Sequence, residues 1–469
     1  MKKGQILEGV IKKVRFPNEG IMEIPGEERR VIVKNTVQGQ RVRVMVQKLR
    51  KSRAQGRLLE VIEKAPGEIE PACPHFGFCG GCTYQNLPYA RQLEIKAAQI
   101  REIMQEAFND GCGWEGIIPS PVQEGYRNKM EFTFGDEYKD GPLALGLHKR
   151  DGFYDIVSVS NCRIADGDFM SILACTLEWA AQSGLPYYHR SSHKGYFRHL
   201  LVRKAAKTGE ILAALVTASG GAETRCVEAE REAEILKQWT ERLLALKLNG
   251  KISGILHTVN NSAADAVKDE GTAVLYGQAY FYEELLGLKF KITPFSFFQT
   301  NSLGAELLYE KTREYAGDTR DKAIFDLYSG TGTIAQVLAP VAKRVTGVEI
   351  VPEAVQAARQ NAMQNGLENC FFHAGDVLKA VDDLKERADL IVLDPPREGV
   401  HPKALEKIMA FDAERIVYIS CKPTSLARDY EIMRAGGYIA ERLACVDLFP
   451  GTAHVETICQ FNRKKGTGG

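Results

Sequence analysis

A cysteine at the end of an apolar stretch is the first residue of this chain whose surroundings suggest chemistry. Cys421 follows the run VYIS and precedes Lys422 and Pro423. A thiolate is a strong nucleophile, and a neighbouring cation such as Lys422 would lower the pKa of the thiol. Further along, the stretch GTAHVETI offers His454 and Glu456 as proton acceptors. The alternative interpretation of the cysteine is a small residue buried in a core.

A glycine-rich turn indicates a ligand site. The stretch DLYSGTGT places Gly330 and Gly332 between an expected strand and an expected helix, where glycine lets the backbone approach a ligand. Glu349 ends the next strand, 19 residues after Gly330, where a carboxylate can accept from both hydroxyls of a ribose. Ile334 and Ala335 follow the turn, so the third glycine of a dinucleotide fingerprint is missing. The spacing favours a nucleoside cofactor, of which S-adenosylmethionine is the common one.

Two further carboxylates end expected strands. Asp376, in HAGD, is placed to accept from the adenine amino group of such a cofactor, and the alternative is a helix N-cap. Asp394 lies in LDPPREG, where two prolines stiffen the chain. In amine methyltransferases, Asn or Asp before Pro-Pro is typically followed by an aromatic residue, whereas this chain has Arg397. The difference argues against an exocyclic amine as the target.

The cysteine, the base and the cofactor edge together suggest one reaction. Carbon 5 of uracil is a poor nucleophile, but addition of a thiolate to carbon 6 gives an enolate whose carbon 5 can attack a methyl sulfonium. A base must then remove the proton from carbon 5 so that the thiolate can leave. Cys421 is therefore the candidate nucleophile, and His454 and Glu456 are the candidate bases.

A second group of cysteines has the spacing of metal ligands. Cys73, Cys79 and Cys82 lie in CPHFGFCGGC, where Gly80 and Gly81 give the backbone freedom to wrap a metal group. Three thiolates and a fourth ligand from elsewhere would suit tetrahedral zinc or an iron–sulfur cluster. Six other cysteines match no motif and are expected in the core: Cys112, Cys175, Cys226, Cys370, Cys445 and Cys459.

The elements that must position these residues divide into about three domains, as 469 residues suggest. Residues 1–64 alternate short β-rich runs with glycine turns and predict a small OB-like β-barrel. The stretch KLRKSRAQGR within it is either a solvated hairpin tip or a phosphate-binding edge. Its cations are Lys48, Arg50, Lys51, Arg53 and Arg57.

The rest of the chain changes character near residue 291. Residues 65–290 mix strands with helical runs and predict a central α+β domain, whose helix at about 88–110 can pack on the domain that follows. Residues 291–469 read as successive βα units. They predict a doubly wound, Rossmann-like parallel sheet whose ligand crevice lies at the carboxyl ends of its strands. Cys421 would share that edge with the cofactor turn.

Composition limits the compartment and leaves the partner open. The net charge of +1 does not exclude nucleic acid, because a local basic patch decides that binding. No apolar run approaches the roughly 20 residues that span a bilayer, and the start MKKGQILEGV lacks the apolar core of a signal peptide. We therefore expect a cytoplasmic protein without membrane attachment, whose cysteines do not form disulfides.

Four stretches together resemble one family: CPHFGFCGGC, PFSFFQTNS, DLYSGTGT with LDPPREG, and SCKP with HVET. Over nearly its whole length the chain resembles the bacterial RNA uracil-C5 methyltransferases, which include ribosomal RNA enzymes with an N-terminal TRAM barrel. The resemblance implies that residues 1–64 are a TRAM barrel that binds RNA. It also implies that residues 291–469 are a class I methyltransferase domain that uses S-adenosylmethionine to make 5-methyluridine.

The resemblance also implies individual roles. Cys421 becomes the nucleophile and Glu456 the base. At the cofactor it implies Gln299, Tyr328, Glu349 and Asp394, with Thr333 as a further contact. Cys162 of SNCRI becomes the fourth thiolate of the metal group, which is then a four-iron four-sulfur cluster with a structural or RNA-orienting role.

The RNA target has two candidates. A TRAM barrel combined with a cluster favours 23S ribosomal RNA, and the T-loop uridine of tRNA is the alternative. The barrel departs from the family in having VKNTVQGQRV where a Pro-Gly turn is usual. An amine methyltransferase acting through DPP and a non-catalytic RNA-binding protein are two further hypotheses. We expect a monomer that flips the target base out of its stack and binds RNA with strong salt dependence.

Overall fold

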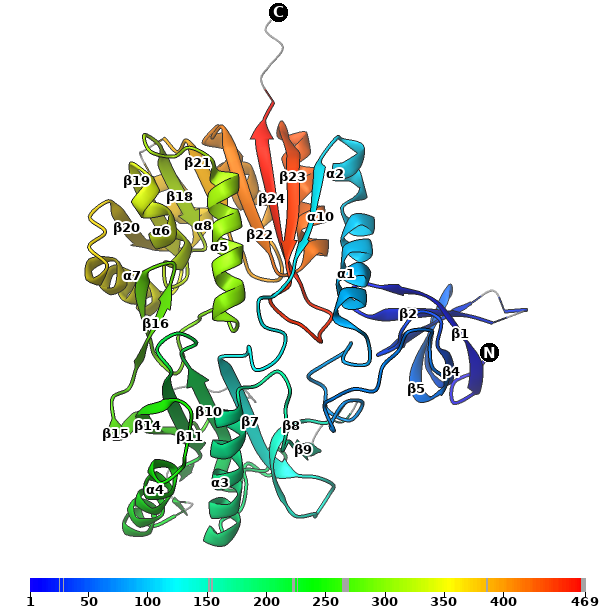
Figure 1. The fold of residues 1–469 in the computed structure, drawn as a ribbon, viewed down its shortest axis with the longest axis vertical. Coiled ribbons are helices and arrows are strands. Elements are labelled where there is room, and N and C mark those ends of the chain that lie inside the picture. Colours follow the sequence, from blue (N-terminus) through cyan, green and yellow to red (C-terminus); the bar gives the residue numbers. More distant parts are fainter. Residues whose placement is uncertain are drawn as a thin grey trace, which may run out of the picture.

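The computed structural model describes residues 1–464 except 25, 28, 151, 153, 154, 222, 223, 226, 264–269, 385 and 386, so Cys226 lies outside the described residues. The chain forms a small barrel, a central sheet and a larger C-terminal sheet (Figure 1). In this view the barrel stands beside the C-terminal sheet and the central sheet lies below it. The three parts lie around a central region, through which the chain passes from one part to the next.

Five strands close the N-terminal barrel in the order β1-β2-β3-β5-β4. They are β1 (Ile6–Arg15), β2 (Glu19–Glu23), β3 (Arg30–Lys34), β4 (Arg41–Leu49) and β5 (Arg53–Glu63). Alternate side chains point inward, and Val31, Val33, Val42 and Val44 are buried there. Gly56 is a position of close packing, because a Cβ there would lie 2.8 Å from Cγ1 of Val31. The predicted N-terminal β-barrel is confirmed.

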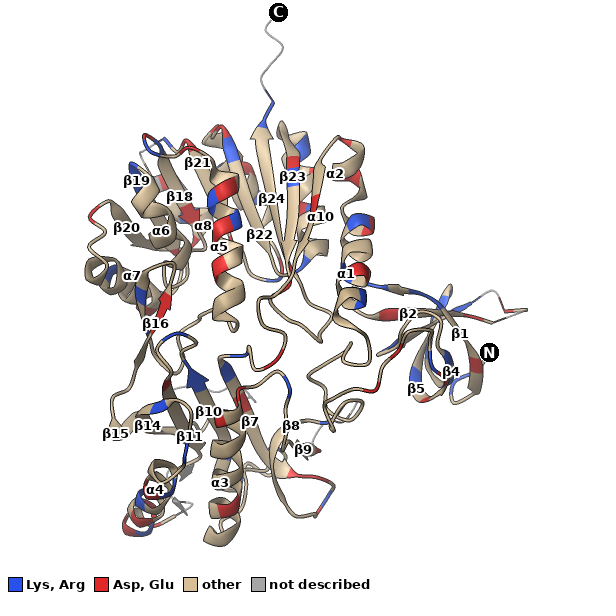
Figure 2. Cartoon of the chain, viewed as in Figure 1, with Lys and Arg blue, Asp and Glu red and all other residues tan. Residues whose placement is uncertain are grey.

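β4 and β5 form a hairpin whose basic residues face solvent. The two strands pair as far as Leu49 and Ala54, so the tip lies between these residues. The cations predicted for this segment, Lys48, Arg50, Lys51, Arg53 and Arg57, are all exposed. Basic residues recur along this part of the barrel in Figure 2. Arg41, near the other end of β4, instead pairs with Glu63 at 2.9 Å.

The central sheet has seven strands in the order β15-β14-β11-β10-β7-β8-β9. They are β7 (Lys129–Asp136), β8 (Leu143–His148), β9 (Ile156–Ser158), β10 (Phe197–Lys204), β11 (Glu210–Thr217), β14 (Lys251–Val259) and β15 (Thr272–Gly277). Two helices, α3 (Gly167–Ser183) and α4 (Ala229–Leu244), pack together through Trp179 and Trp239, whose ring centroids lie 5.9 Å apart. A short ribbon is formed by β12 (Gly220–Gly221) and β13 (Thr224–Arg225).

The C-terminal sheet has eight strands in the order β20-β19-β18-β21-β22-β24-β23-β6. They are β6 (Gly113–Ile118), β18 (Ala323–Leu327), β19 (Arg344–Glu349), β20 (Cys370–Ala374), β21 (Leu390–Leu393), β22 (Arg415–Ser420), β23 (Tyr438–Val446) and β24 (Glu456–Arg463). The five strands β18 to β22 are parallel to one another, whereas β24 is antiparallel to β22 and β23. The strand order reverses between β18 and β21, where a doubly wound sheet opens its ligand crevice. The predicted doubly wound fold is confirmed.

Helices cover both faces of this sheet (Figure 1). They are α5 (Ser302–Ala316), α6 (Thr333–Leu338), α7 (Pro352–Gln364), α8 (Val377–Asp383), α9 (Pro402–Ala410) and α10 (Pro423–Ala435), with the 3₁₀ turn η1 (Ala339–Val341). A hairpin of β16 (Phe281–Leu285) and β17 (Leu288–Ile292) connects the central sheet to α5. Phe281 and Phe290 of this hairpin are buried in the same core as α5 and α6.

A segment from the middle of the chain completes the C-terminal sheet. β6 runs parallel to β23, with Trp114 paired to Leu443. It follows α1 (Tyr89–Ile103) and α2 (Gln105–Asn109), and Ile100 and Met104 are buried in one core with strand β22. The sequence interpretation placed the whole of residues 65–290 in the central domain and foresaw only a packed helix. The strand β6 is only six residues long, and the residues GWEGII do not by themselves indicate which sheet they join.

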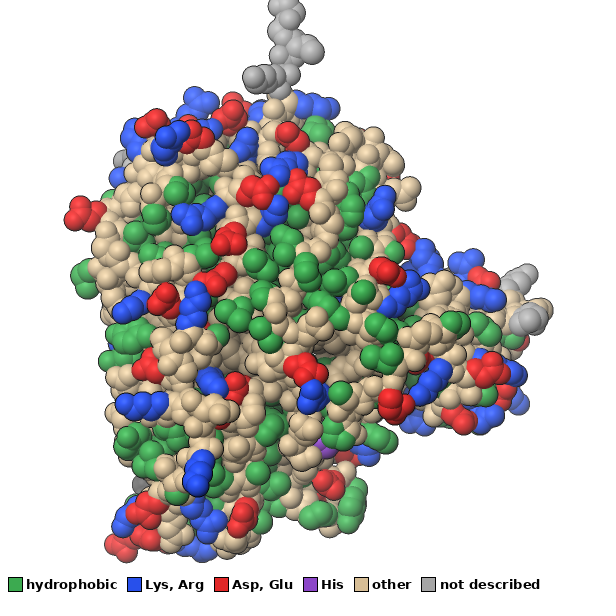
Figure 3. All heavy atoms as spheres, viewed as in Figure 1, with side chains coloured by type: hydrophobic (Ala, Val, Ile, Leu, Met, Phe, Trp, Pro, Cys, Tyr) green, Lys and Arg blue, Asp and Glu red, His purple; other side chains and the backbone are tan. Residues whose placement is uncertain are grey.

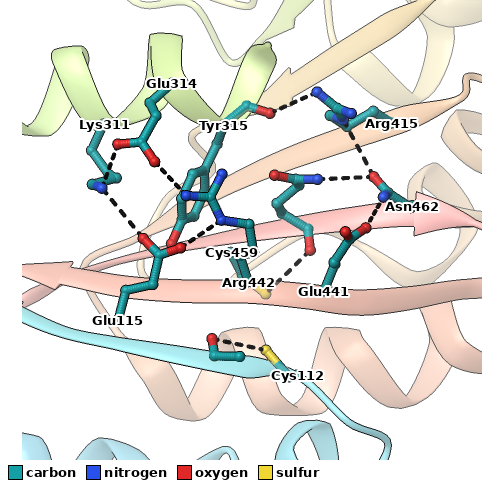
Figure 4. Close-up of polar contacts among 12 residues, drawn as sticks. Cys112, Glu115, Lys311, Glu314, Tyr315, Arg415, Glu441, Arg442, Cys459 and Asn462 are labelled. Carbon is teal, nitrogen blue, oxygen red and sulfur yellow. Dashed lines mark hydrogen bonds and ion pairs between the residues drawn. The ribbon is translucent and has the colours of Figure 1, made fainter.

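A network of charges fastens β6 to its neighbours (Figure 4). Glu115 of β6 accepts from Lys311 of α5 at 3.3 Å and from Nε of Arg442 of β23 at 2.5 Å. Glu314 of α5 also pairs with both cations. The guanidinium of Arg442 lies 4.6 Å from the ring centroid of Tyr315. Several shared partners make such a network more stable than isolated surface pairs.

The surface shown in Figure 3 mixes acidic, basic and apolar side chains over all three parts. Acidic and basic groups alternate closely on the C-terminal part of this face, in keeping with the small net charge. Over the described ranges of the chain, no helix combines the length and apolar character needed to cross a membrane.

Candidate active site

The two residues proposed for covalent chemistry lie on adjacent strand ends. Ser420, the last residue of β22, pairs with Thr457 of the antiparallel strand β24. Cys421 comes directly after β22 and Glu456 is the first residue of β24, so the two residues face each other at this edge, where the charge of Glu456 acts on the thiol. Cys421 is half-buried, whereas Glu456 is only 4% exposed. Helix α10 starts two residues after Cys421, at Pro423, which suits the first helical position.

The charges of these groups are interdependent. Burial raises the pKa of Glu456 to about 8, and the charge of Asp394 adds to the rise while Arg397 opposes it. Burial raises the pKa of Asp394 to about 7. Burial and then Glu456 raise the pKa of Cys421 to about 11, and Arg397 opposes this rise by its charge and a hydrogen bond. The free protein therefore holds the thiol protonated at neutral pH, and Arg397 is the cation that favours its thiolate.

The loop before Glu456 is fixed by residues from the other end of the chain. Lys96 of α1 and Asp447 form a fully buried ion pair at 2.7 Å. The carbonyl of Gly451 accepts from the backbone N–H groups of Thr83 and Tyr84, at 2.8 and 2.9 Å. These two residues follow Cys82 directly, so the segment that carries the cysteine motif also holds the loop that leads to the candidate base.

His454 lies in this loop and is half-buried. Burial lowers its pKa, and the charges of Arg397, Lys96 and Arg127 lower it further. The imidazole is therefore neutral at physiological pH. Glu456, whose charge acts on Cys421, is the better placed of the two candidate bases.

The glycine turn has the conformation expected for a ligand cradle. Gly330 and Gly332 have φ values of 54° and 75°, which favour glycine. A Cβ on Gly332 would lie 2.5 Å from the ring of Phe372, whereas the described atoms leave the space beside Gly330 open. The N–H of Gly330 donates to Oε2 of Glu349 at 3.0 Å, and Val351 donates to Oε1 at 2.9 Å. The turn therefore fixes the carboxylate expected to bind a ribose.

Asp326 is a site residue that the sequence analysis did not single out. Its Oδ2 accepts from the N–H of Ala335 at 2.9 Å, whereas Oδ1 is buried without a hydrogen-bond partner among the described residues. Burial raises the pKa of Asp326 to about 8, with contributions from the charges of Asp394 and Glu349. An unsatisfied buried carboxyl oxygen at a crevice fits a ligand that brings its own donor, as the amino group of S-adenosylmethionine would. The available signal was its place as the last acidic residue before the glycine turn.

Gln299 is held by its backbone and by its side chain. Its carbonyl accepts from Nδ2 of Asn128 at 2.8 Å. Its side-chain amide acts on the phenol of Tyr309, a buried residue of α5, and opposes the rise in the pKa of that phenol. Burial raises the pKa of Tyr309, and the charges of Asp394, Asp326 and Glu456 raise it further. Tyr309 thus connects Gln299 to the cluster of three carboxyls, and nothing in its helical sequence pattern indicated this role.

The remaining candidates for cofactor contact border the same crevice. Tyr328 has a φ of 68°, unusual for a residue with a side chain, and its N–H donates to Val348 at 3.0 Å. Burial, then Asp376, raises the pKa of Tyr328 to about 12. Asp376 caps α8, because its Oδ1 accepts from Leu378 at 3.0 Å, so the alternative reading of this residue is present in the structure. Thr333 is buried at the first position of α6.

The four cysteines proposed to bind a metal group line one small cavity. Cys73, Cys79, Cys82 and Cys162 converge there, with Ile164 among the apolar residues around them. Within the described ranges, no group of three or more Cys, His, Asp or Glu side chains is arranged to hold a single metal ion. In an iron–sulfur cluster each thiolate binds a different iron, so the ligands need not converge on one point. Four cysteines around one cavity are a donor set that suits either a metal ion or an iron–sulfur cluster.

The surroundings of these sulfurs supply hydrogen-bond donors. The N–H of Gly81 donates to Sγ of Cys79 at 3.3 Å, and Nε2 of Gln85 donates to Sγ of Cys82 at 3.1 Å. Burial raises the pKa of Cys82 to about 12, and it also raises the pKa values of Cys79 and Cys162. Buried thiols that are close enough to raise one another's pKa, with donors aimed at the sulfurs, suit thiolates bound to a metal group.

Among the other cysteines that the structure describes, Cys112 and Cys445 lie close enough to Cys459 to add to the rise that burial causes in the pKa of its thiol. Four are buried as expected: Cys112, Cys370, Cys445 and Cys459. Cys175 is half-buried on α3.

The known proteins that this chain resembles include RNA methyltransferases. The family model for tRNA (uracil-5-)-methyltransferase matches residues 273–464. An uncharacterized RNA methyltransferase of Clostridium tetani is 45% identical over 464 residues, which are 99% of each chain. One from Caldanaerobacter subterraneus subsp. tengcongensis is 46% identical over 462 residues, 98% of this chain and 99% of its own.

A solved structure shares the whole architecture. The tRNA (uracil-54, C5)-methyltransferase of Pyrococcus abyssi, in complex with S-adenosyl-L-homocysteine, superposes with a TM-score of 0.74 at 24% sequence identity. The match covers 97% of this chain and 99% of the other. Identity at full length to RNA methyltransferases, together with the family model over the catalytic part, settles the relationship. The chain is an RNA uracil-5 methyltransferase by family.

Proposed function

We propose that this protein transfers a methyl group from S-adenosylmethionine to carbon 5 of a uridine in structured RNA, giving 5-methyluridine. One observation carries the proposal: Cys421 and Glu456 face each other on adjacent strand ends, on the edge that also carries the glycine turn. A reaction at an amine nitrogen needs no thiol nucleophile, whereas carbon 5 of uracil requires one.

The thiol begins the reaction. The thiol of Cys421 loses its proton to solvent, and the thiolate forms a bond to carbon 6 of the uracil. The electron pair of the 5,6 double bond moves towards the carbonyl at carbon 4 as an enolate. Arg397 favours the thiolate, as its effect on the pKa of Cys421 indicates. Bound S-adenosylmethionine would supply an electrophilic methyl group, which carbon 5 accepts while the bond between that methyl group and sulfur breaks to leave S-adenosylhomocysteine.

The base completes the reaction. Carbon 5 then carries both the methyl group and its original hydrogen. The carboxylate of Glu456 removes that hydrogen as a proton, the 5,6 double bond forms again, and the bond between carbon 6 and Cys421 breaks to release the thiolate. Because the pKa of Glu456 is raised to about 8, the group is suited to exchange protons near neutral pH.

Several residues would hold the cofactor in this scheme. Glu349 would accept from the ribose hydroxyls, and Asp376 would accept from the adenine amino group while capping α8. The other proposed contacts are the glycine turn at Gly330 and Gly332, and Gln299, Tyr328, Thr333 and Asp394. The open space beside Gly330 among the described atoms supports this placement.

We further propose that Cys73, Cys79, Cys82 and Cys162 bind a four-iron four-sulfur cluster with a structural role. Thr83 and Tyr84 join this segment to the loop before Glu456, so a stable cluster would also hold the base in place. Replacement of Cys162 by Ala should reduce the iron and acid-labile sulfide content of anaerobically purified protein. Iron content equal to that of the wild type would contradict the ligand set.

The RNA that we propose is 23S ribosomal RNA, bound in part by the exposed cations of the barrel hairpin. The second candidate is the T-loop of tRNA, which is supported by the name of the solved Pyrococcus abyssi enzyme with the same architecture. In either RNA the target base must leave its stack to meet both Cys421 and the methyl donor.

A transfer assay tests the proposal. The protein, reconstituted with iron and sulfide without air, is incubated with unmodified 23S ribosomal RNA or tRNA and methyl-labelled S-adenosylmethionine. Mass spectrometry of the nucleosides should place the label in 5-methyluridine from one of the two RNAs, which also identifies the substrate. Label on an amino group of a base, or no label in either RNA, would contradict the proposal.

A further inference from the structure

A buried arginine at the end of β10 has no carboxylate partner among the described residues. Arg203 is 1% exposed, and burial lowers its pKa to about 10, so it remains charged at neutral pH. The next residue, Lys204, pairs with Asp166 and Asp168 at 2.8 Å each. Burying an unpaired charge is costly unless hydrogen bonds compensate. The hydrogen bonds of Arg203 must therefore offset the cost of burying its charge.

The partners of Arg203 are carbonyl groups of one loop. Its Nη1 donates to the carbonyl oxygens of Thr293 at 2.8 Å, Pro294 at 3.2 Å and Ser296 at 2.8 Å. Ser296 and Thr293 also bond to each other, with the hydroxyl of Ser296 donating to the carbonyl of Thr293 at 3.1 Å. Three carbonyls that converge on one cation fix the path of this short segment closely.

This segment leads directly to Gln299. On the far side, Asn128 holds the chain by donating from Nδ2 to the carbonyl of Gln299 and from its backbone N–H to that of Thr300, each at 2.8 Å. The carbonyl of Asn128 in turn accepts from the N–H of Lys204 at 2.9 Å, which links it to the strand that bears Arg203. Residues in or next to the central sheet thus hydrogen-bond to the backbone on both sides of the Gln299 side chain.

We propose that Arg203 is a positioning residue: by holding the carbonyls of residues 293, 294 and 296, it aligns Gln299 with Tyr309 and the carboxyl cluster of the active site. The effect of this alignment on methyl transfer rests on the proposed function. The central domain thereby takes part in catalysis through the backbone of one loop, and not only in binding.

A double-mutant cycle tests the coupling. Single-turnover formation of 5-methyluridine is measured for the full-length, cluster-loaded wild type, Arg203→Met, Gln299→Ala and the double variant. Arg203→Met should slow the reaction about 10- to 100-fold while leaving the Kd for RNA unchanged, because it misplaces one contact group. In the Gln299→Ala background the same change should have little further effect. Independent, multiplying effects of the two substitutions would overturn the proposal.

Arg198 supplies a matched control on the same strand. It is also buried, but its Nη1 donates to the carbonyls of Asn260 and Ser262, away from the loop. The effect of Arg198→Met should multiply with that of Gln299→Ala. If Arg203→Met does not fold, Arg203→Lys keeps the charge but loses the planar guanidinium, and its cycle with Gln299→Ala decides by the same criterion.

A second measurement is independent of activity. Amide hydrogen exchange in the peptide that covers residues 295–301 should be faster in the Arg203 variant than in the wild type, and unchanged in Arg198→Met. Unchanged exchange in the Arg203 variant would overturn the proposal whatever RNA the enzyme uses. If the wild type makes no 5-methyluridine but the exchange result holds, the proposed function fails and the positioning of Gln299 stands.

Discussion

Cys421 and Glu456 face each other at the paired ends of β22 and β24, and the charge of Glu456 raises the pKa of the Cys421 thiol. The free enzyme therefore holds both groups protonated near neutral pH. Two acids kept neutral beside each other avoid the repulsion between a thiolate and a carboxylate. The two groups act at different steps, because the thiolate is needed first and the carboxylate is needed only after methyl transfer.

Replacing Glu456 by Gln should trap the enzyme on its RNA. The thiol can still add to carbon 6 and carbon 5 can still accept the methyl group, but the proton on carbon 5 has no acceptor. A protein–RNA adduct should therefore accumulate and survive a denaturing gel, with overall turnover reduced by about 10²-fold or more. If the variant instead formed no adduct and turned over normally, the base would have to be a different residue.

Replacing Cys421 by Ala should abolish turnover without loss of the cofactor. The side chain is half-buried and carries no hydrogen bond that the fold depends on, so the variant should fold. Its affinity for S-adenosylhomocysteine, measured by calorimetry, should match that of the wild type. Substantial methylation by this variant would refute the covalent mechanism and favour direct transfer to an amine.

Arg397 should control the reactivity of the Cys421 thiol. Because Arg397 opposes the rise in the pKa of Cys421, Arg397→Met should raise that pKa further and slow alkylation by iodoacetamide at pH 8. Peptide mass spectrometry separates the label on Cys421 from that on other cysteines. Lys422→Met is the matched control, because Arg397, and not the neighbouring Lys422, is the cation that opposes the rise in the pKa of Cys421. Equal alkylation rates in wild type and Arg397→Met would contradict this role.

The buried carboxyls should make the folded protein less stable as the pH rises. Burial raises the pKa values of Asp326 and Glu456 to about 8 and that of Asp394 to about 7, well above their unfolded values of about 4. The native state then binds protons that the unfolded state has lost. The stabilisation is complete below about pH 4 and is lost towards pH 8, at up to about 1.4 kcal/mol per pH unit for each proton.

Asp326→Asn tests this linkage. The amide cannot titrate, so the free energy of unfolding in urea should fall less steeply between pH 5.5 and 7.5 than in the wild type, by up to about 1.4 kcal/mol per pH unit. The comparison uses the slope with pH, since the substitution can also change stability at every pH. Identical slopes would mean that Asp326 is ionised in the folded protein.

The barrel hairpin should bind RNA phosphates. Lys51→Gln and Arg53→Gln remove exposed cations that form no ion pair within the described residues. Each lost phosphate contact should lower the slope of log Kd against log salt concentration by about 0.7 to 0.9. Arg41→Gln is the matched control, because Arg41 is also an exposed cation of the barrel but pairs with Glu63. An unchanged slope in the double variant would place RNA elsewhere.

The residues at this edge of the sheet could be predicted from the sequence, because the end of an apolar run marks the end of a buried strand. Cys421, Gly330 and Glu349 each follow an apolar run, and parallel strands bring their carboxyl ends to one edge. The barrel could also be predicted from the sequence, because short β-rich runs alternate with glycine turns. Cys162 came from resemblance alone, because nothing local marks a ligand so far along the chain from Cys82.

Other features depend on contacts between distant segments. β6 joins the sheet through Trp114 and Leu443, which no local pattern relates. Arg203 donates to carbonyl groups far along the chain, and Tyr309 lies near carboxyl groups from several other strands, yet each resembles an ordinary strand or helix residue in its own segment. Such roles become visible only when the fold brings the partners together.

Release of hydrogen from carbon 5 tests the central claim most directly. RNA transcribed with uridine tritiated at carbon 5 is incubated with the enzyme and methyl-labelled S-adenosylmethionine, and tritium in water is compared with methyl incorporation. Addition of Cys421 and proton removal by Glu456 predict one tritium released for each methyl group transferred. Methyl incorporation without release of tritium would contradict the mechanism, because carbon 5 would then have kept its hydrogen.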